Sequence, residues 1–320
     1  MQEKNENTEK TAVRFLTISA DQAGQRIDNF LLTCLKGAPK SLIYRILRKG
    51  EVRVNKGRIK PLYRLQEGDE VRVPPIRLAE KTTATPHAAQ LKRVEDSIIY
   101  EDKRVLVLNK PSGMAVHGGS GIDFGVIEAL RALRPDAPYM ELVHRLDRDT
   151  SGCLLIAKKR SQLRYLHEQL REHQIEKYYT TLIKGSWQGG TRKINVPLRK
   201  NTLQSGERMV RVDETGKEAV SHFSPLAVTK LASLMQVALE TGRTHQIRVH
   251  AQHSEHPIAG DEKYGDEAFN RLMREKGLRR LFLHASKIVF YVTDNDQPVV
   301  VEAPLDDALK QVLKKLEIEV

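Results

Sequence analysis

The chain has 320 residues, of which 53 are Lys or Arg and 41 are Asp or Glu, so its formal net charge is +12 at neutral pH. This length predicts two domains, or one large domain with an appendage, and the positive excess favours a polyanionic partner, nucleic acid first. No apolar run approaches the roughly 18 residues that span a bilayer, and there are only two cysteines. The sequence therefore argues against spanning helices and a disulfide scaffold, and we expect a cytoplasmic protein.

A compact unit is predicted over residues 14–74, behind a polar tail at residues 1–13 that we expect to be disordered. Apolar residues recur at helical spacing over residues 27–35, which predicts an amphipathic helix. A second helix is predicted over residues 40–49, where apolar and basic residues occupy opposite arcs. Short strands are expected after it, at residues 52–54 and 71–73.

The basic residues of this unit are concentrated in one stretch. Between Lys40 and Arg64 the chain carries nine Lys or Arg and a single acid, Glu51. A solvated helix face usually interleaves both signs of charge, so this one-sided pattern indicates a surface for a polyanion. We expect four of these side chains to contact such a partner: Arg45, Arg48, Lys49 and Arg53.

A linker and a larger domain of mixed content follow. Residues 75–94 carry Pro and Thr with few apolar residues, which predicts an extended, partly flexible tether. Strand and helix patterns share residues 95–320 without a regular βαβ repeat, so we expect an α+β fold with a mixed, mostly antiparallel sheet. The strands are predicted at residues 104–108, 152–158, 178–184, 234–240 and 281–291, and the helices at residues 125–133, 161–173, 244–253 and 305–316.

Motifs for common cofactors are missing from the sequence. It holds no GxxxxGK[ST] phosphate loop, no GxGxxG that opens a helix after a strand, no HExxH zinc motif and no GxSxG nucleophile elbow. Cys34 and Cys153 stand outside any CxxC pair and are expected to be small core residues. We therefore expect no metal and no cofactor, and a reaction performed by ordinary side chains.

The segment from His144 to Gly152 is the most informative part of the chain. It places an imidazole, two guanidinium groups and two carboxylates between two apolar stretches. A charged loop between strands is where a scaffold displays reactive groups, although Asp147 or Asp149 alone could simply form a turn. Three further segments carry polar residues near strand ends: residues 109–117, 177–179 and 241–250.

Together these segments resemble the RluA family of pseudouridine synthases. The stretch His144-Arg145-Leu146-Asp147-x-x-Thr150-Ser151-Gly152 matches the active-site signature of that family. The other family motifs are similar to Asn109-Lys110-Pro111, Tyr179, Gly242 to His250, His256 to Asp261 and Leu281 to Ala285. The N-terminal unit resembles an S4 RNA-binding domain through Arg26 to Leu31, Gly50 to Asn55 and Gly68 to Val71. The resemblance covers residues 14–304 and points to the members that modify several uridines of bacterial 23S ribosomal RNA.

The resemblance implies an isomerase that converts uridine within RNA to its C-glycoside isomer. It assigns the catalytic carboxylate to Asp147 and the cation that keeps this carboxylate charged to Arg248. Tyr179 is expected to pack on the flipped base and to assist the later proton transfer at C5. Asp149 is the competing acid, but only Asp147 stands at the signature position. Further RNA contacts are expected from His117, His144, Arg145 and Arg243, although a structural hydrogen bond explains the two histidines equally well.

Two other interpretations remain open. One is a non-catalytic RNA-binding or ribosome-assembly factor, which the basic N-terminal unit alone would explain. The other is a pseudouridine synthase for other rRNA uridines or for tRNA. The set of Asp147, Tyr179 and Arg248 favours an enzyme, and the S4-like unit favours ribosomal RNA. We expect a monomer that binds 23S rRNA or the large-subunit precursor.

Overall fold

The computed structural model describes residues 12–35, 38–76, 88–118, 124–202, 208–294 and 296–319. It divides the chain into two compact units, residues 1–83 and 84–320. Most of the expected N-terminal tail and much of the expected linker lie outside the described residues. Among the described helices, none combines the length and the apolarity that a bilayer crossing requires.

The N-terminal unit packs two helices against a small antiparallel sheet. The sheet has the order β1-β3-β2. Its elements are β1 (Arg14–Thr17), a 3-10 turn at Ala20–Gln22, α1 (Ile27–Cys34), α2 (Lys40–Arg48), β2 (Arg53–Val54) and β3 (Glu70–Val73). The apolar side of α2 is buried in the core of the unit through Ile43, Ile46 and Leu47, whereas Arg45 and Arg48 are exposed. Both predicted helices and their amphipathic pattern are therefore confirmed.

The C-terminal unit contains the remaining elements. Its helices are α3 (Ala88–Glu95), α4 (Val126–Leu133), α5 (Arg160–Arg171), α6 (Gln246–His253), α7 (Glu267–Glu275) and α8 (Asp307–Lys315). Its strands are β4 (Ile98–Glu101), β5 (Val105–Lys110), β6 (Glu141–Leu142), β7 (Ser151–Ala157), β8 (Glu176–Lys184), β9 (Arg192–Asn195), β10 (Leu198–Thr202), β11 (Arg208–Val212), β12 (Val220–Val228), β13 (Ala232–Leu239), β14 (Leu283–Phe290) and β15 (Val299–Glu302).

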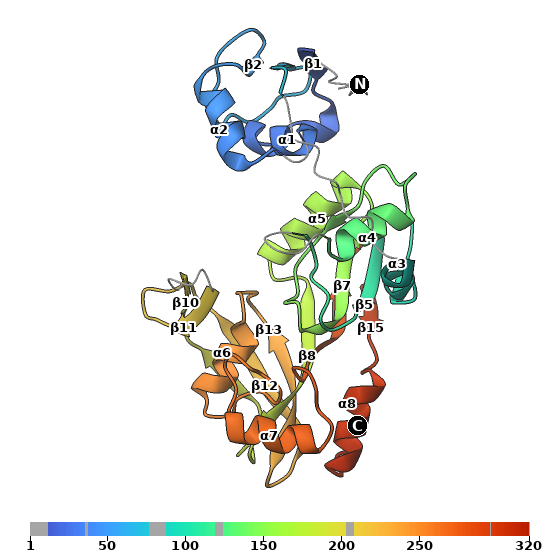
Figure 1. Ribbon diagram of the computed structural model, residues 1–320, viewed down its shortest axis with the longest axis vertical. Coiled ribbons are helices and arrows are strands. Elements are labelled where there is room, and N and C mark those ends of the chain that lie inside the picture. The colour runs from blue at the N-terminus through green and yellow to red at the C-terminus, as the bar shows by residue number, and fades with distance from the viewer. Residues whose placement is uncertain are drawn as a thin grey trace, which may run out of the picture. The chain divides into compact units, whose positions relative to one another are not determined.

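One large sheet forms the frame of this unit (Figure 1). Its main path runs β4-β5-β7-β14-β8-β13-β12-β9, while β15 pairs with β14 and β6 pairs with β7. Among the described residues every pairing in this sheet is antiparallel except that of β7 with β14. In Figure 1, α4 and α5 lie beside the β5–β7 half, and α6 and α7 lie beside the β12–β13 half. The α+β fold with a mixed, mostly antiparallel sheet is thus confirmed.

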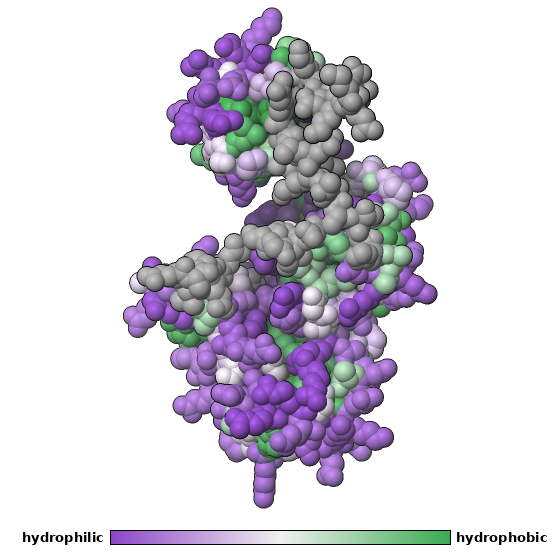
Figure 2. Space-filling model, in the orientation of Figure 1, coloured by the Kyte–Doolittle hydropathy of each residue, from purple (hydrophilic) through white to green (hydrophobic). Residues whose placement is uncertain are grey.

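Strand β7 occupies the middle of the hydrophobic core. All seven of its residues, from Ser151 to Ala157, are buried. Cys153 is 1% exposed, as expected for a small core residue, whereas Cys34 is only half-buried. A strand covered on both faces reads as a continuous apolar run, which is why the sequence marked it clearly. Hydrophilic side chains cover most of the visible face of the C-terminal unit (Figure 2).

Several elements differ from the sequence expectation. Helix α3 lies in the segment that we expected to be an extended linker, and its Val94 is fully buried against the core, so residues 88–94 are helical rather than extended. Strand β12 contains Pro225, where the pairing with β13 shifts register. Proline cannot donate to a β-ladder and normally argues against a strand, so this element was not expected. The pair β10-β11 forms a separate two-stranded sheet.

Candidate active site

Arg248 lies between two carboxylates. It stands in the first turn of α6 and is 8% exposed. Its Nε and Nη2 donate to the two oxygens of Asp261, at 2.7 and 2.8 Å. Its Nη1 is 3.5 Å from Oδ2 of Asp147, whose side chain is 20% exposed. The planar guanidinium is therefore fixed by Asp261 on one edge and presents its remaining nitrogen to Asp147.

The electrostatics of the Asp261–Arg248 pair favour the ionised forms. Burial opposes the ionisation of Asp261 most strongly, but the hydrogen bonds and charge of Arg248 outweigh it and hold the pKa of Asp261 below its ordinary value. Burial likewise opposes the charge on Arg248, while Asp261 and then Asp147 raise the pKa of the guanidinium. Arg248 is thus a permanent cation in contact with the partly buried side chain of Asp147.

His245 gives Asp147 a second neighbour. It is the residue before α6, with a φ of 54°, and its Nε2 lies 3.7 Å from Oδ2 of Asp147. Burial is the main reason that the pKa of His245 is lowered, so the ring is neutral at pH 7. The Tyr264 hydroxyl accepts the backbone N–H of Val210 at 2.9 Å and lies 2.8 Å from Nδ1 of His245. A neutral ring with its proton on Nε2 turns a donor toward the oxygen of Asp147, whereas the other tautomer would turn a lone pair toward it; the favoured arrangement therefore has the Tyr264 hydroxyl donating to Nδ1.

The loop that carries Asp147 is held from beneath by the Asn109-Lys110-Pro111 segment. Lys110 is fully buried, and its Nζ donates to the carbonyls of Pro111, Met114 and Arg148 at 2.9 to 3.0 Å. The Ser112 hydroxyl donates to the carbonyl of Asp149 at 2.7 Å. Burial lowers the pKa of Lys110 to about 7, and the three carbonyls use all three hydrogens of its ammonium form. Lys110 is therefore a structural brace and not an exposed cation.

The loop ends at the start of β7, where this strand pairs in parallel with β14. Gly152, with a φ of +105°, is the second residue of β7, and a Cβ there would lie 2.2 Å from the carbonyl oxygen of Ala285 in β14. The Ser151 hydroxyl lies 2.8 Å from Nδ1 of buried His284, whose Nε2 donates to the Ala303 carbonyl. This close approach allows the parallel β7–β14 pairing and requires glycine at position 152.

Tyr179 faces the same region from β8. It is 7% exposed and belongs to the main hydrophobic core. Burial and then the charge of Asp147 raise the pKa of its hydroxyl, so the phenol is neutral at physiological pH. A neutral hydroxyl suits packing and hydrogen bonding better than proton abstraction.

The remaining predicted RNA contacts of this unit fall into two groups. Nε2 of His144 accepts the backbone N–H of Leu155 at 3.1 Å, and burial lowers the pKa of His144 to about 3, so this ring is neutral and acts inside the fold. His117, Arg145 and Arg243 are exposed. Nε of Arg243 donates to the carbonyl of Glu218 at 2.9 Å. Arg45, Arg48, Lys49 and Arg53 are exposed on the N-terminal unit.

Two residues of the site carried no role in the sequence analysis. Asp261 and His245 both stand in segments that we noted as motifs, yet neither spacing nor composition links them to Asp147. Asp261 contacts Arg248, 13 positions away, and Arg248 in turn contacts Asp147, 101 positions away, so only the fold brings these residues together. His245 likewise reaches Asp147 only in the folded chain.

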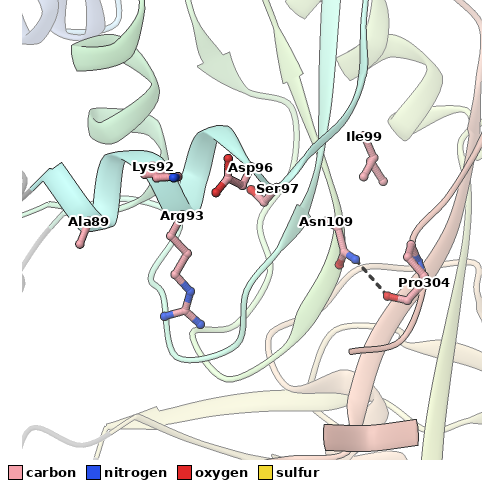
Figure 3. A pocket seen from close by; sticks show the side chains of 8 residues that line it. All are labelled: Ala89, Lys92, Arg93, Asp96, Ser97, Ile99, Asn109 and Pro304. Carbon is pink, nitrogen blue, oxygen red and sulfur yellow. Dashed lines mark hydrogen bonds between the residues drawn. The ribbon is translucent and has the colours of Figure 1, made fainter. Parts of the chain in front are cut away.

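A separate pocket of this unit lies away from these residues (Figure 3). It has a volume of about 590 Å³ and contains the Asn109 side chain, whose Nδ2 donates to the carbonyl of Pro304 at 3.0 Å. Its lining consists of Ala89, Lys92, Arg93, Asp96, Ser97, Ile99, Asn109 and Pro304, and does not include Asp147, Tyr179 or Arg248. Across the described parts of the chain, no three His, Cys, Asp or Glu side chains are grouped so as to hold a metal ion.

Comparisons with known proteins identify the family of both parts of the chain. Residues 104–253 match the family model described as RNA pseudouridylate synthase, and residues 25–71 match the S4 domain. The chain is 57% identical to ribosomal large subunit pseudouridine synthase C of Escherichia coli K12, over 97% of this chain and 98% of the relative. It is 58% identical to the protein of the same name from Pasteurella multocida, over 98% and 97% of the two chains. The solved structure of human RNA pseudouridylate synthase domain containing 4 superposes with a TM-score of 0.60 at 25% identity, over 72% of this chain and 97% of the human one.

Proposed function

The chain belongs to the RluA family of pseudouridine synthases, and on this basis we propose that it isomerises several uridines of 23S ribosomal RNA with Asp147 as its catalytic carboxylate. Family membership makes the protein an isomerase that acts on RNA, so the non-catalytic interpretation is set aside. The large-subunit substrate is supported by the names of relatives that match nearly the whole chain. The observation that carries the role of Asp147 is its partly buried contact with the fixed guanidinium of Arg248.

The reaction needs a negative charge beside the ribose of the target nucleotide. Breaking the N-glycosidic bond develops positive character at C1′, which an ionised carboxylate stabilises. Asp147 acts there, either by attacking C1′ or by removing a ribose proton. Arg248 holds one oxygen of Asp147, and the Nε2 proton of neutral His245 faces the same oxygen, Oδ2. Both contacts limit the rotation of the carboxylate and place positive or donor groups beside it.

The uracil must turn so that its C5 bonds to the same ribose carbon. The target base has to leave its stack to reach Asp147, and an aromatic ring beside the carboxylate gives it a packing surface. Tyr179 is our candidate for this surface, because it lies in the core within electrostatic range of Asp147 and its hydroxyl is neutral. We assign it packing and a hydrogen bond to the base during the final proton transfer at C5.

The N-terminal unit supplies position and affinity in this proposal. The exposed basic side of α2, through Arg45, Arg48 and Lys49, contacts RNA phosphates, which carry no base identity. In the C-terminal unit, His117, Arg145 and Arg243 are exposed and are assigned supporting RNA contacts. His144 is half-buried and its Nε2 accepts a backbone N–H, so its RNA contact stays a prediction. We further propose two domains, at residues 14–74 and 95–320, with the preceding helix α3 packed on the second. We also propose a monomer, since one chain supplies the whole site, and action in the cytoplasm on 23S rRNA or its large-subunit precursor.

The exchange of Asp147 for Asn tests the catalytic assignment. Asp147→Asn keeps the shape of the side chain but removes its charge, so we expect no isomerisation of 23S rRNA and nearly unchanged RNA binding. Carbodiimide labelling followed by primer extension detects pseudouridine, and fluorescence anisotropy measures binding. Asp149→Asn is the matched control, since Asp149 is half-buried in the same loop and should retain most activity. Full turnover by Asp147→Asn would refute the assignment.

A further inference from the structure

The sheet of the N-terminal unit has an outer face with an exposed aromatic ring. The Cα register aligns Phe15 of β1 with Arg72 of β3, and Arg72 with Arg53 of β2. Residues directly opposite one another in neighbouring strands share a face. The next row, Leu16, Val71 and Val54, points the other way into the core. Phe15 is 60% exposed and does not belong to the hydrophobic core of this unit, so its ring faces away from that core.

A groove of about 430 Å³ runs along this outer face. Its lining residues are Phe15, Gly50, Arg53, Lys56, Glu70 and Arg72. Three of the six are cations and one is a carboxylate, so the groove is positive. Within the described residues, Arg53, Lys56 and Arg72 take part in no ion pair with a carboxylate. Their charges are therefore not neutralised inside the unit.

The two arginines are held in place by backbone carbonyls. Nη1 of Arg72 donates to the carbonyl of Glu51 at 2.7 Å. Nε and Nη1 of Arg53 lie 3.4 and 3.3 Å from the carbonyls of Gly50 and Lys56. These contacts orient the guanidinium groups without cancelling their charge, which leaves further donors for an anion.

Lys56 is placed beside them by a strained turn. Asn55 and Lys56 have φ values of 48° and 66°, and Val54 and Gly57 exchange two backbone hydrogen bonds across them. The Asn55 side chain fixes the turn, since it donates to Asp69 at 2.8 Å and accepts the backbone N–H of Glu70 at 2.9 Å. A lysine held in the left-handed region is uncommon, and such strain persists only where the surroundings impose it.

We propose that this groove binds an unpaired nucleotide of the RNA, with the base stacked on Phe15 and the flanking phosphates on Arg53 and Lys56. Proteins bind single-stranded RNA with aromatic rings bordered by cations, because every base has a face that can stack and every phosphate linkage carries a negative charge. The site is distinct from the α2 face assigned above, which reads phosphates alone. The inference rests on the proposed function for the identity of the RNA but not for the chemistry of the groove.

The test compares the full-length protein with Phe15→Leu, which keeps an apolar side chain and removes the ring. Anisotropy of a labelled oligouridine strand should show about 5- to 50-fold weaker binding by Phe15→Leu, with an unchanged dependence on salt. Phe15→Trp, which keeps an aromatic ring at this position, should bind as tightly as the unaltered chain. Lys56→Gln should instead reduce the slope of log affinity against log salt by about 0.7. Leu62→Ala is the matched control, since Leu62 is 65% exposed in the same unit, does not line the groove and should change nothing.

Two outcomes would overturn the inference, and two further measurements separate it from a folding defect and from the proposed function. Equal oligouridine binding by Phe15→Leu and the unaltered chain would overturn it, as would an equal loss of affinity for duplex RNA, whose bases are not free to stack. The thermal midpoint of Phe15→Leu should match that of the unaltered chain. Unchanged affinity in Phe15→Trp together with the loss in Phe15→Leu separates stacking from a folding defect. Absence of 23S rRNA isomerisation by the unaltered chain would instead contradict the proposed function and leave the binding result standing.

Discussion

Replacing Asp261 by Asn would test how the cleft keeps Arg248 in place. Asp261 is 1% exposed and accepts two hydrogen bonds from Arg248 together with the backbone N–H groups of Lys263 and Tyr264. The amide of Asn has the same shape but no charge, and one of its two acceptors becomes a donor. Arg248 would then remain buried with a partner that satisfies it poorly.

The expected loss of stability follows from the burial of this pair. Removing one partner of a buried ion pair costs about 3–5 kcal/mol, because the other charge is left uncompensated. For a unit of this size, each kcal/mol lowers the thermal midpoint by roughly 2–4 °C, so Asp261→Asn should unfold about 6–20 °C earlier. Activity at a temperature where the protein is folded should fall about 100-fold, since Arg248 no longer holds Asp147 in a fixed direction.

A double-mutant cycle separates the pair from its surroundings. Arg248→Met should destabilise the protein because Asp261 is left charged and buried, and the double variant Arg248→Met/Asp261→Asn should be less unstable than the sum of the single changes by about 2 kcal/mol or more. Calorimetry supplies these values. Glu141→Gln is the control, since the Arg131–Glu141 pair has both side chains about 45% exposed and should contribute under about 1 kcal/mol. Strict additivity in the Arg248–Asp261 cycle would refute this account of the cleft.

Three more predictions concern packing, pH and RNA affinity. Gly152→Ala should cost about 2–3 kcal/mol more than Gly189→Ala in thermal unfolding, because both positions have positive φ but only the Cβ at 152 meets a backbone carbonyl; equal costs would remove the steric argument. The lowered pKa of Asp261 stabilises the fold above the ordinary value of 3.8 and stops doing so as pH falls through the folded value, so acid unfolding followed by circular dichroism should be flatter below pH 3.8 in Asp261→Asn, and parallel curves would contradict it. Deleting residues 1–83 should weaken 23S rRNA binding and reduce its salt slope by about 3 in filter-binding assays, and an unchanged slope would count against the phosphate contacts of α2.

The sequence predicted the core elements of this fold because their burial leaves a periodic pattern. Helices α1 and α2 repeat their apolar residues every three or four positions, and β7 is apolar throughout. Strands at the margins were not predicted. In β12 the chain passes Pro225 within an irregular pairing, and β10 and β11 mix charged and apolar residues without a regular alternation on a small separate sheet. These strands owe their form to their partners and not to local preference.

The candidate site also contains residues that the sequence predicted and residues that it did not. Asp147 and Arg248 stood in segments whose order resembled a family, and the structure brings them together. Asp261 and the proton arrangement of His245 were not predictable, because each depends on a contact that the fold creates. For His144 the sequence left an RNA contact and a structural hydrogen bond equally open; its ring accepts the backbone N–H of Leu155 in β7, and the RNA contact stays a prediction.

The parallel pairing of β7 with β14 involves only two residue pairs, Ser151 with His284 and Gly152 with Ala285. Asp147 comes from the β7 side of this join, whereas Arg248 comes from α6 beyond β13 on the other side. A small rotation of one half-sheet against the other would therefore lengthen or shorten the 3.5 Å separation of the acid from its cation. The distance between these two charged groups therefore depends on how the two halves of the sheet are packed. RNA binding or a mutation that shifts one half would change the position of Asp147 relative to the ribose of the target nucleotide.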